Sequence, residues 1–316
     1  MSETQRKAAR LRVLGSALLT LTAMIWGTAF VAQRVGMERI EPLTFSAARM
    51  ALAAVAVGLL AAILARREKP RPDARQVNKN SLVGGILCGA FLAAASIFQQ
   101  MGIVTTTAGK AGFITALYML LVPIFATIFF HKKNGWLVWL AVGIGVVGMY
   151  LLCVTESFTL TRGDALVCVC AVLFSGHILC CDHFAPRAEP IRMSAIQFAS
   201  ATVICAIAAF IAEQPSWEKV ASAAVPILYC GLVSGGVGYT LQIVAQRWTD
   251  PTVASLLMSL ESVFAVLAGA LLIGERMSPR EAAGCAIMFL AILLVQIPTG
   301  RRKKPSPSGE GGSPKD

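Results

Sequence analysis

The sequence predicts an all-α polytopic membrane protein with ten transmembrane helices, arranged as two inverted five-helix repeats. Three observations lead to this fold class: the composition, a series of long apolar runs and an internal repeat. Of the 316 residues, 56% are hydrophobic and only 14% are charged, whereas soluble domains are about 25% charged. A soluble chain of this composition would expose more apolar surface than water tolerates. The composition therefore excludes soluble domains, and it also excludes a disordered chain.

Ten apolar runs are each long enough to cross about 30 Å of hydrocarbon. Such runs must be helical because backbone polar groups in lipid have to be satisfied within the segment, and barrel strands would alternate apolar and polar residues. The first run follows basic residues, but it is too long for a signal peptide and has no small-residue cleavage site, so we expect an uncleaved helix. The expected helices are 13–33, 42–64, 82–104, 108–130, 136–154, 163–182, 191–212, 223–246, 251–273 and 279–297.

Lysines and arginines are distributed unevenly between the predicted loops. Of 28 basic residues, 20 lie on the side of the N-terminus, 7 lie on the opposite side, and Arg49 lies within a span. Because basic residues concentrate in cytoplasmic loops, we expect a multi-pass protein of the cytoplasmic membrane with both termini in the cytoplasm. The net charge of +11 comes from these clusters between spans, so it indicates contact with a lipid bilayer and no nucleic-acid partner.

The chain also repeats itself. A shift of 148 residues places 15–53 over 163–201 with 11 identities in 39 positions, among them Glu41-Pro42 over Glu189-Pro190. Further along, a shift of 143 places Gln99 over Gln242. Because each half has five spans, an odd number, the second half enters the membrane from the opposite side. Inverted repeats are typical of secondary transporters, whose substrate site lies where the halves meet.

The repeat divides the chain into five parts. We expect a cytoplasmic N-terminus at 1–12, a first repeat at 13–154, a linker at 155–162, a second repeat at 163–297 and a basic, disordered cytoplasmic tail at 298–316.

Several short motifs stand out, among them Trp26-Gly27, Pro42 with Arg49, and Leu260-Glu261-Ser262. Over essentially all of 13–297 the chain resembles a known family, the EamA-type ten-helix transporters of the drug/metabolite transporter superfamily. The resemblance implies alternating access and export of a small polar, amino-acid-like metabolite; nucleobase-like and lipophilic drug-like compounds remain open as substrates. In three places the chain differs from the family pattern: Ser262 follows Glu261 where Pro is common, His131-Lys132-Lys133 ends the span 108–130, and Phe174-Ser175 replaces the Trp-Gly pair. The matching motifs are Trp26-Gly27, Pro42 with Arg49, Ala111-Gly112-Phe113-Ile114 through Val122-Pro123, Leu260-Glu261-Ser262 and Gly274-Glu275-Arg276.

Two charged residues within the spans are the leading site candidates, because charge at membrane depth is costly and usually faces the bundle interior. Arg49 is interpreted either as an anchor for an anionic substrate group, since guanidinium binds carboxylates in a fork, or as a side chain that snorkels outward. Glu261 is the one acid deep in a span. It is interpreted as a proton-coupling site, as a counter-charge for an amine, or as part of a structural pair.

Other polar and aromatic side chains in the spans are candidates for substrate binding, with interhelical hydrogen bonding or core packing as the alternative role. Trp26 offers stacking or cation–π contact, and His177 offers a pH-sensitive contact. The pairs Gly85/Gly89 and Gly231/Gly235 are interpreted as packing motifs. The remaining binding candidates are Gln99, Gln100, Tyr118, Tyr239 and Gln242.

No cofactor or metal is expected. The nine cysteines form no C-x-x-C pair and lie in or beside apolar runs, which indicates small apolar packing residues. With three histidines the spacing predicts no zinc site. The resulting hypothesis is a secondary transporter for a small-molecule substrate, with protons as a candidate coupling ion and a monomer or dimer as the functional unit.

An intramembrane enzyme is the alternative from another class. Ser234 and His177 are its nearest candidates, but they lack the motif and the acidic partner that a protease needs. A nucleotide-driven pump is excluded because the sequence has no P-loop, and no filter-like repeat indicates a channel. The protein is therefore not expected to be an enzyme.

Overall fold

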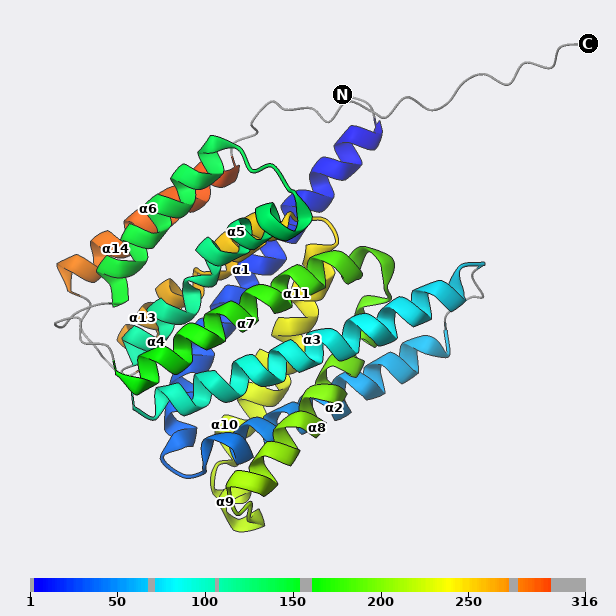
Figure 1. The fold of residues 1–316 in the computed structure, drawn as a ribbon, viewed down its shortest axis with the longest axis vertical. Coiled ribbons are helices and arrows are strands. Elements are labelled where there is room, and N and C mark those ends of the chain that lie inside the picture. The colour runs from blue at the N-terminus through cyan, green and yellow to red at the C-terminus, as the bar shows by residue number, and fades with distance from the viewer. Residues whose placement is uncertain (1–2, 68–71, 106–107, 154–160, 273–277, 297–316) are drawn as a thin grey trace, which may run out of the picture.

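The computed structural model describes residues 3–67, 72–105, 108–153, 161–272 and 278–296. Gly274-Glu275-Arg276, most of the linker and the C-terminal tail lie outside the described residues. Every predicted apolar run is helical within the described part (Figure 1). The helices are α1 (Glu3–Met37), α2 (Pro42–Ala65), α3 (Ala74–Ile103), α4 (Ala108–Ala116), α5 (Tyr118–Phe130), α6 (Trp136–Cys153), α7 (Arg162–Phe184), η1 (Ala185–Arg187), α8 (Pro190–Ala212), α9 (Trp217–Ser222), α10 (Ala224–Leu228), η2 (Tyr229–Tyr239), α11 (Thr240–Gln246), α12 (Pro251–Met258), α13 (Glu261–Leu272) and α14 (Pro279–Gln296).

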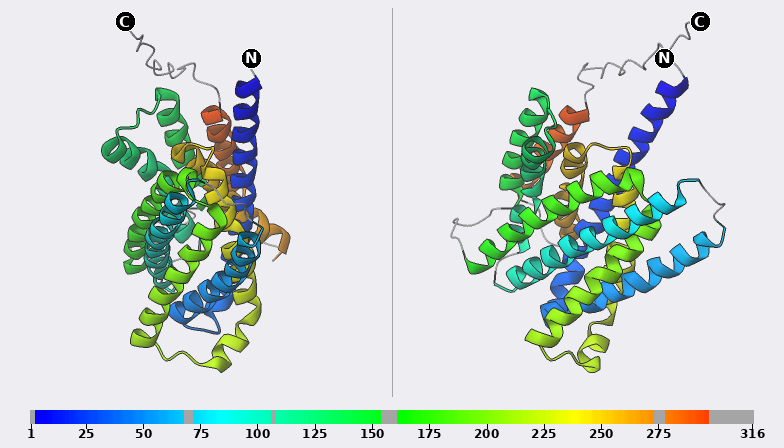
Figure 2. Two further views of the ribbon diagram at one scale, coloured as in Figure 1. Left: turned by 90° about the vertical axis from the view of Figure 1, so that its right-hand side faces the viewer. Right: turned by 45° about the vertical axis from the view of Figure 1, so that its right-hand side comes forward.

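The fold class is confirmed as an all-α polytopic membrane protein. Among the described residues there are eight helices long and apolar enough to cross a membrane, and Trp136–Leu151 is a shorter apolar helix. Large apolar side chains are exposed along these helices, for example Phe210 on α8 and Leu293 on α14, as expected where lipid is the solvent. The N-terminal part of α1 extends beyond the other helices (Figure 2).

Three spans that the sequence predicts as continuous helices are interrupted. The run 108–130 divides into α4 and α5 at Leu117, and the run 251–273 divides into α12 and α13 at Ser259 and Leu260. At the second break the Ser259 hydroxyl donates to the carbonyl of Leu256, at 2.8 Å, and the Ser262 amide donates to the Ser259 carbonyl at 3.3 Å. Serine hydroxyls that bond to backbone carbonyls compete with regular helix geometry.

The third interruption is a π-helix, η2, between α10 and α11. Its sequence YCGLVSGGVGY contains four glycines. Glycine lowers helix propensity and leaves room for other segments to approach, and π-helical turns are frequent at functional sites.

The helices of the two halves pack in a pattern that is unchanged when the halves are exchanged. In the first half α3 packs against α7 and α8, and in the second half η2 packs against α1 and α2. Similarly, α1 packs on α13, while α7 packs on α4 and α5. The pairs α2–α8 and α6–α14 each join equivalent helices, and α5–α12 joins the two broken spans. Figure 1 shows the α2–α8 and α6–α14 pairs at opposite edges of the bundle.

Small residues bring helices of different halves close together. A Cβ added to Gly89 on α3 would lie 2.4 Å from the carbonyl oxygen of Gln197 on α8. One added to Gly231 on η2 would lie 3.0 Å from the carbonyl oxygen of Arg49 on α2. Both glycines therefore act in helix packing, which is the role that their spacing predicts.

The two Glu-Pro corners begin equivalent helices but use their glutamates differently. Glu189 caps its own helix, since its carboxylate accepts from the amides of Ile191 at 3.2 Å and Arg192 at 2.6 Å. Glu41 does not cap α2 and pairs instead with Lys219. The amides of α2 at Leu43 and Thr44 donate to Glu213, at 2.9 and 2.7 Å. The start of α2 is thus held by a residue of the other half.

Candidate functional site

A small cavity of about 40 Å³ lies between the halves. Both halves contribute to its lining, through α1, α2, α3, α4 and α5 on one side and α7, η2, α11 and α13 on the other. The structure places almost all of the predicted site residues on this one surface: Trp26, Arg49, Gln99, Tyr118, His177, Tyr239, Gln242 and Glu261.

Arg49 is the basic residue of the cavity lining. The side chain is buried, with 7% of its surface exposed, and the guanidinium lies over the Phe45 ring at 5.7 Å. Its Nη1 donates to Gln33 Oε1 at 3.3 Å, a long and weak hydrogen bond. Its Nε has no hydrogen-bond partner among the described residues. The guanidinium therefore has donors left for a ligand, and it does not snorkel outward.

Gln100 lies next to Gln33 and is not among the residues that line the cavity. It is fully buried and its amide donates to Gln33 Oε1. Gln33 thus accepts from both Gln100 and Arg49. The side chain of Gln33 lines the cavity. Gln33, and not Gln100, is therefore placed to make the substrate contact predicted for Gln100.

Glu261 is the acidic residue of the cavity lining. It begins α13 at the break in the span, where the partial positive charge of a helix N-terminus favours a carboxylate. Its Oε1 accepts from the Tyr118 hydroxyl at 3.1 Å. A Cβ on Gly27 would lie 2.6 Å from the Glu261 carbonyl oxygen, so the Trp-Gly motif of α1 is in close contact with the same break. Neither Glu261 nor Arg49 forms an ion pair within the described residues.

Aromatic and amide groups make up much of the remaining lining. The rings of Trp26 and Tyr239 lie 4.6 Å apart, and the Trp26 indole donates to the Ser234 carbonyl at 3.2 Å. The Gln99 amide donates to Thr115 Oγ1 at 3.2 Å. The Gln242 amide donates to Gln246 at 3.0 Å, while Gln242 Oε1 has no partner among the described residues. These groups offer stacking and neutral hydrogen bonds.

His177 lies on the cavity wall and is buried, with 1% of its surface exposed. Its Nε2 is 2.8 Å from Gln197 Oε1, and its ring stands edge-on to Tyr239 at 5.8 Å. The histidine therefore belongs both to the cavity and to a buried polar cluster behind it.

Sequence reasoning did not select several lining residues. Gln33 is the last residue of the predicted span 13–33, but α1 continues to Met37, so Gln33 lies one turn inside the helix. Four apolar residues also line the cavity, and they have no distinguishing sequence signal because any buried helix contains such residues. They are Ala29, Phe30, Phe174 and Ile178.

Comparison with known proteins defines the class. The chain belongs to the EamA-like transporter family, which matches residues 13–154 and 161–297, and so to the drug/metabolite transporter superfamily. The chain is 26% identical over 284 residues to an uncharacterized transporter of Archaeoglobus fulgidus, across 88% of this chain and 84% of that protein.

A second relative carries a more specific name. It is a probable terminal-alkyne amino-acid exporter of Streptantibioticus cattleyicolor, 24% identical over 300 residues, across 92% of this chain and 96% of that protein. One solved crystal structure has the same fold, with a TM-score of 0.71 at 18% identity over 89% of this chain and 96% of that one. The family and these relatives point to a membrane transporter and away from an enzyme.

Proposed function

We propose that this protein is a secondary transporter for a small zwitterionic, amino-acid-like metabolite, which it exports by alternating access. The observation that supports this most strongly is the pair of unpaired charges in one cavity. Arg49 and Glu261 come from different halves and each keeps only neutral hydrogen-bond partners among the described residues. A zwitterion supplies one carboxylate for the guanidinium and one ammonium for the carboxyl, so it satisfies both groups at once.

The mechanism follows from the packing. Since equivalent helices of the two halves pack in a similar pattern, exchanging the conformations of the halves would give a second arrangement of similar energy. Substrate held between Arg49 and Glu261 contacts both halves. Glu261 is also proposed as the proton-coupling group, because desolvation favours the neutral form of a carboxyl and a bound ammonium would favour the ionised one.

The orientation proposed from the basic loops is a cytoplasmic membrane with both termini inside. Fusing a reporter to the C-terminus tests it: green fluorescent protein would fluoresce, while alkaline phosphatase would be inactive. An active phosphatase fusion would contradict this orientation.

The test of function is a thermal-shift screen of the purified protein in detergent with amino acids, nucleobases, amines and organic acids, at two pH values. A ligand of the native state raises the melting temperature by mass action. We expect neutral amino acids to give the largest shift, and Arg49→Ala to abolish it. Arg39→Ala is the control, because Arg39 bonds the Ser222 carbonyl outside the cavity, at 3.0 Å. A shift only with nucleobases, or a shift retained in Arg49→Ala, would overturn the proposal.

A further inference from the structure

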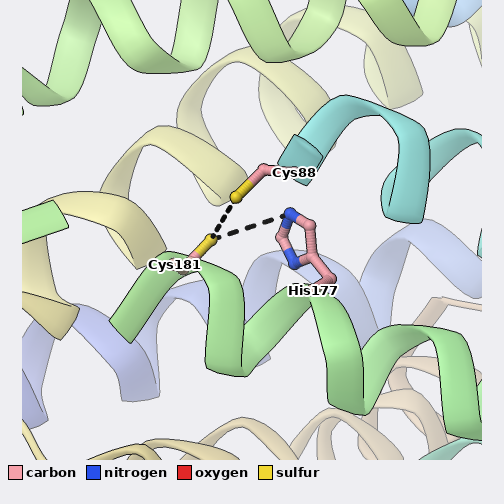
Figure 3. A group of neighbouring side chains, drawn as sticks. All are labelled: Cys88, His177 and Cys181. Atoms are coloured by element: carbon pink, nitrogen blue, oxygen red, sulfur yellow. Dashed lines mark hydrogen bonds between the residues drawn. The ribbon is translucent and has the colours of Figure 1, made fainter. Parts of the chain in front are cut away.

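Behind the cavity wall, three metal-ligating side chains from two helices meet. Cys88 on α3 and His177 and Cys181 on α7 have their ligand atoms within 4.8 Å of one another. The Cys88 and Cys181 sulfurs are 3.6 Å apart, and the Cys181 sulfur is 3.8 Å from His177 Nε2. Figure 3 shows the Cys88 thiol facing the Cys181 thiol across the two helices, with the His177 ring beside them on the same helix as Cys181. All three side chains are buried, and both cysteines are free thiols.

Two of the three spacings match those of ligands around one small ion. In a tetrahedral zinc site, Zn–S bonds of about 2.3 Å and Zn–N bonds of about 2.0–2.1 Å place two sulfurs about 3.8 Å apart and sulfur and nitrogen about 3.6 Å apart. The two distances observed are within about 0.2 Å of these values. The donor set of two sulfurs and one imidazole is also the type that soft, thiophilic ions select.

The surroundings can accommodate a bound ion once His177 releases one partner. The Gln197 oxygen faces His177 Nε2 at 2.8 Å, while the Gln197 amide nitrogen has no partner among the described residues. That amide is therefore only half satisfied by the histidine, and it can turn away when Nε2 takes another ligand. Met193 and Ile243 are fully buried in the same cluster, and the Cys180 thiol also lies beside Cys88.

We propose that Cys88, His177 and Cys181 bind one soft d10 metal ion, Zn(II) or Cu(I), at the wall of the cavity. Binding releases the thiol protons to solvent, because thiolates are the ligands. His177 contributes Nε2 as a neutral imidazole and gives up its contact with Gln197. Three protein ligands leave a further position open toward the cavity side, where His177 is part of the lining.

The spacing along the chain gave no indication of this site, which is why the sequence predicted no metal. Cys88 is separated from the other two ligands by some ninety positions, and the i, i+4 pair of His177 and Cys181 alone is too common to indicate one. Cys88 meets His177 and Cys181 because α3 packs on α7.

The direct test is metal binding to the full-length protein in detergent, stripped with a chelator and kept reduced with a phosphine. Zn(II) and Cu(I) are titrated separately against chromophoric competitors, and Co(II) is added for its thiolate charge-transfer absorption. We expect one equivalent of Zn(II) or Cu(I), and at least a tenfold weaker affinity in each of Cys88→Ser, Cys181→Ser and His177→Gln. Cys205→Ser is the matched control, since Cys205 is also fully buried in a span but lies in another cluster.

Two results would overturn the site. One is binding of well under one equivalent of either ion by folded protein, as judged by size-exclusion chromatography. The other is stoichiometric binding that the three variants and Cys205→Ser weaken equally, which would place the ion elsewhere.

The bound ion would also affect transport, an inference that rests on the proposed function. Because α3 belongs to the first half and α7 to the second, a bound ion would tie the halves together and slow their exchange. In proteoliposomes the same ion should then inhibit amino-acid flux in the wild type and not in Cys88→Ser. The binding titration does not depend on transport, so failure of the metal site and failure of the proposed function are distinguishable.

Discussion

The two halves of the molecule supply the same positions to the cavity but different side chains. With the shift of 148 residues in the first helices of each half and 143 further along, five lining residues of one half align with five of the other. The helix scaffold therefore repeats, and the halves differ in the side chains that they present to the cavity. The aligned lining pairs are Trp26/Phe174, Ala29/His177, Phe30/Ile178, Gln99/Gln242 and Tyr118/Glu261.

The divergence separates the charges. Arg49 aligns with Gln197, and Glu261 aligns with Tyr118, so the first half has the cation and the second half has the acid. Tyr118 and Glu261 begin the second helix of each broken span and hydrogen-bond to each other at 3.1 Å. A zwitterion bound between these groups would have one orientation only, although the fold around it is nearly symmetric.

The largest effect is expected from removing the cation. Arg49→Ala should weaken binding of the best amino-acid ligand about tenfold to a hundredfold, since a hydrogen bond to a charged group contributes about 1.5–3 kcal/mol. Gln197→Ala, at the aligned position, should change the affinity by less than about threefold because Gln197 does not line the cavity. Ligand titrations followed by melting temperature measure both. Equal losses of affinity in the two variants would contradict the proposed functional difference between the halves.

The next effect concerns the packing that the halves share. Gly89→Ala should destabilise the protein by about 1–3 kcal/mol, since overpacking a tight contact costs that much and the carbonyl oxygen of Gln197 would be 2.4 Å from the new Cβ. Gly231→Ala should cost less, because its nearest contact would be 2.9 Å.

Gly58→Ala is the control for both glycine variants, as nothing lies within 4 Å of its added Cβ. Thermal unfolding in detergent should rank the three variants in this order. A destabilisation by Gly58→Ala as large as that by Gly89→Ala would show that helix contact is not the cause.

A smaller effect is expected at the broken spans. Tyr118→Phe removes the hydroxyl that donates to Glu261 and should weaken amino-acid binding about twofold to tenfold, the value of one neutral hydrogen bond of about 0.5–1.5 kcal/mol. Tyr150→Phe is the control, because Tyr150 is exposed on α6. Affinity unchanged in Tyr118→Phe and lost in Glu261→Gln would mean that Glu261 acts without its tyrosine partner.

The smallest effect distinguishes the two Glu-Pro corners. Lys219 hydrogen-bonds Glu41 and lowers the pKa of that carboxyl below its ordinary value. A lowered folded-state pKa stabilises the protein above the unfolded pKa of about 4.3, and this contribution is lost as the pH falls through the folded pKa.

Glu41→Gln should therefore reduce the loss of melting temperature between pH 6 and pH 3, by an amount within the 0–1 kcal/mol of exposed ion pairs. At neutral pH it should have a small destabilising effect. Lys219→Ala is the companion variant and should flatten the same part of the profile. An unchanged acid profile in both variants would contradict the role assigned to this pair.

The sequence was sufficient for the architecture because lipid imposes a simple rule: long apolar runs become helices. It located Arg49 and Glu261 because charge is rare in such runs, and the structure brings both to one cavity. It did not predict the breaks at Leu117 and Ser259, since these depend on local hydrogen bonds that a hydropathy pattern does not contain. It also did not indicate the meeting of Cys88 with His177 and Cys181, which depends on how α3 packs on α7.

The most direct test of the central claim is flux into proteoliposomes of one neutral amino acid, its carboxamide, which lacks the carboxylate, and its N-acetyl derivative, which lacks the ammonium. The account predicts that wild type transports only the zwitterion. It also predicts that Arg49→Ala no longer discriminates against the carboxamide, and that Glu261→Gln no longer discriminates against the N-acetyl derivative. Equal transport of all three compounds by wild type would contradict the claim that one substrate joins the two charges.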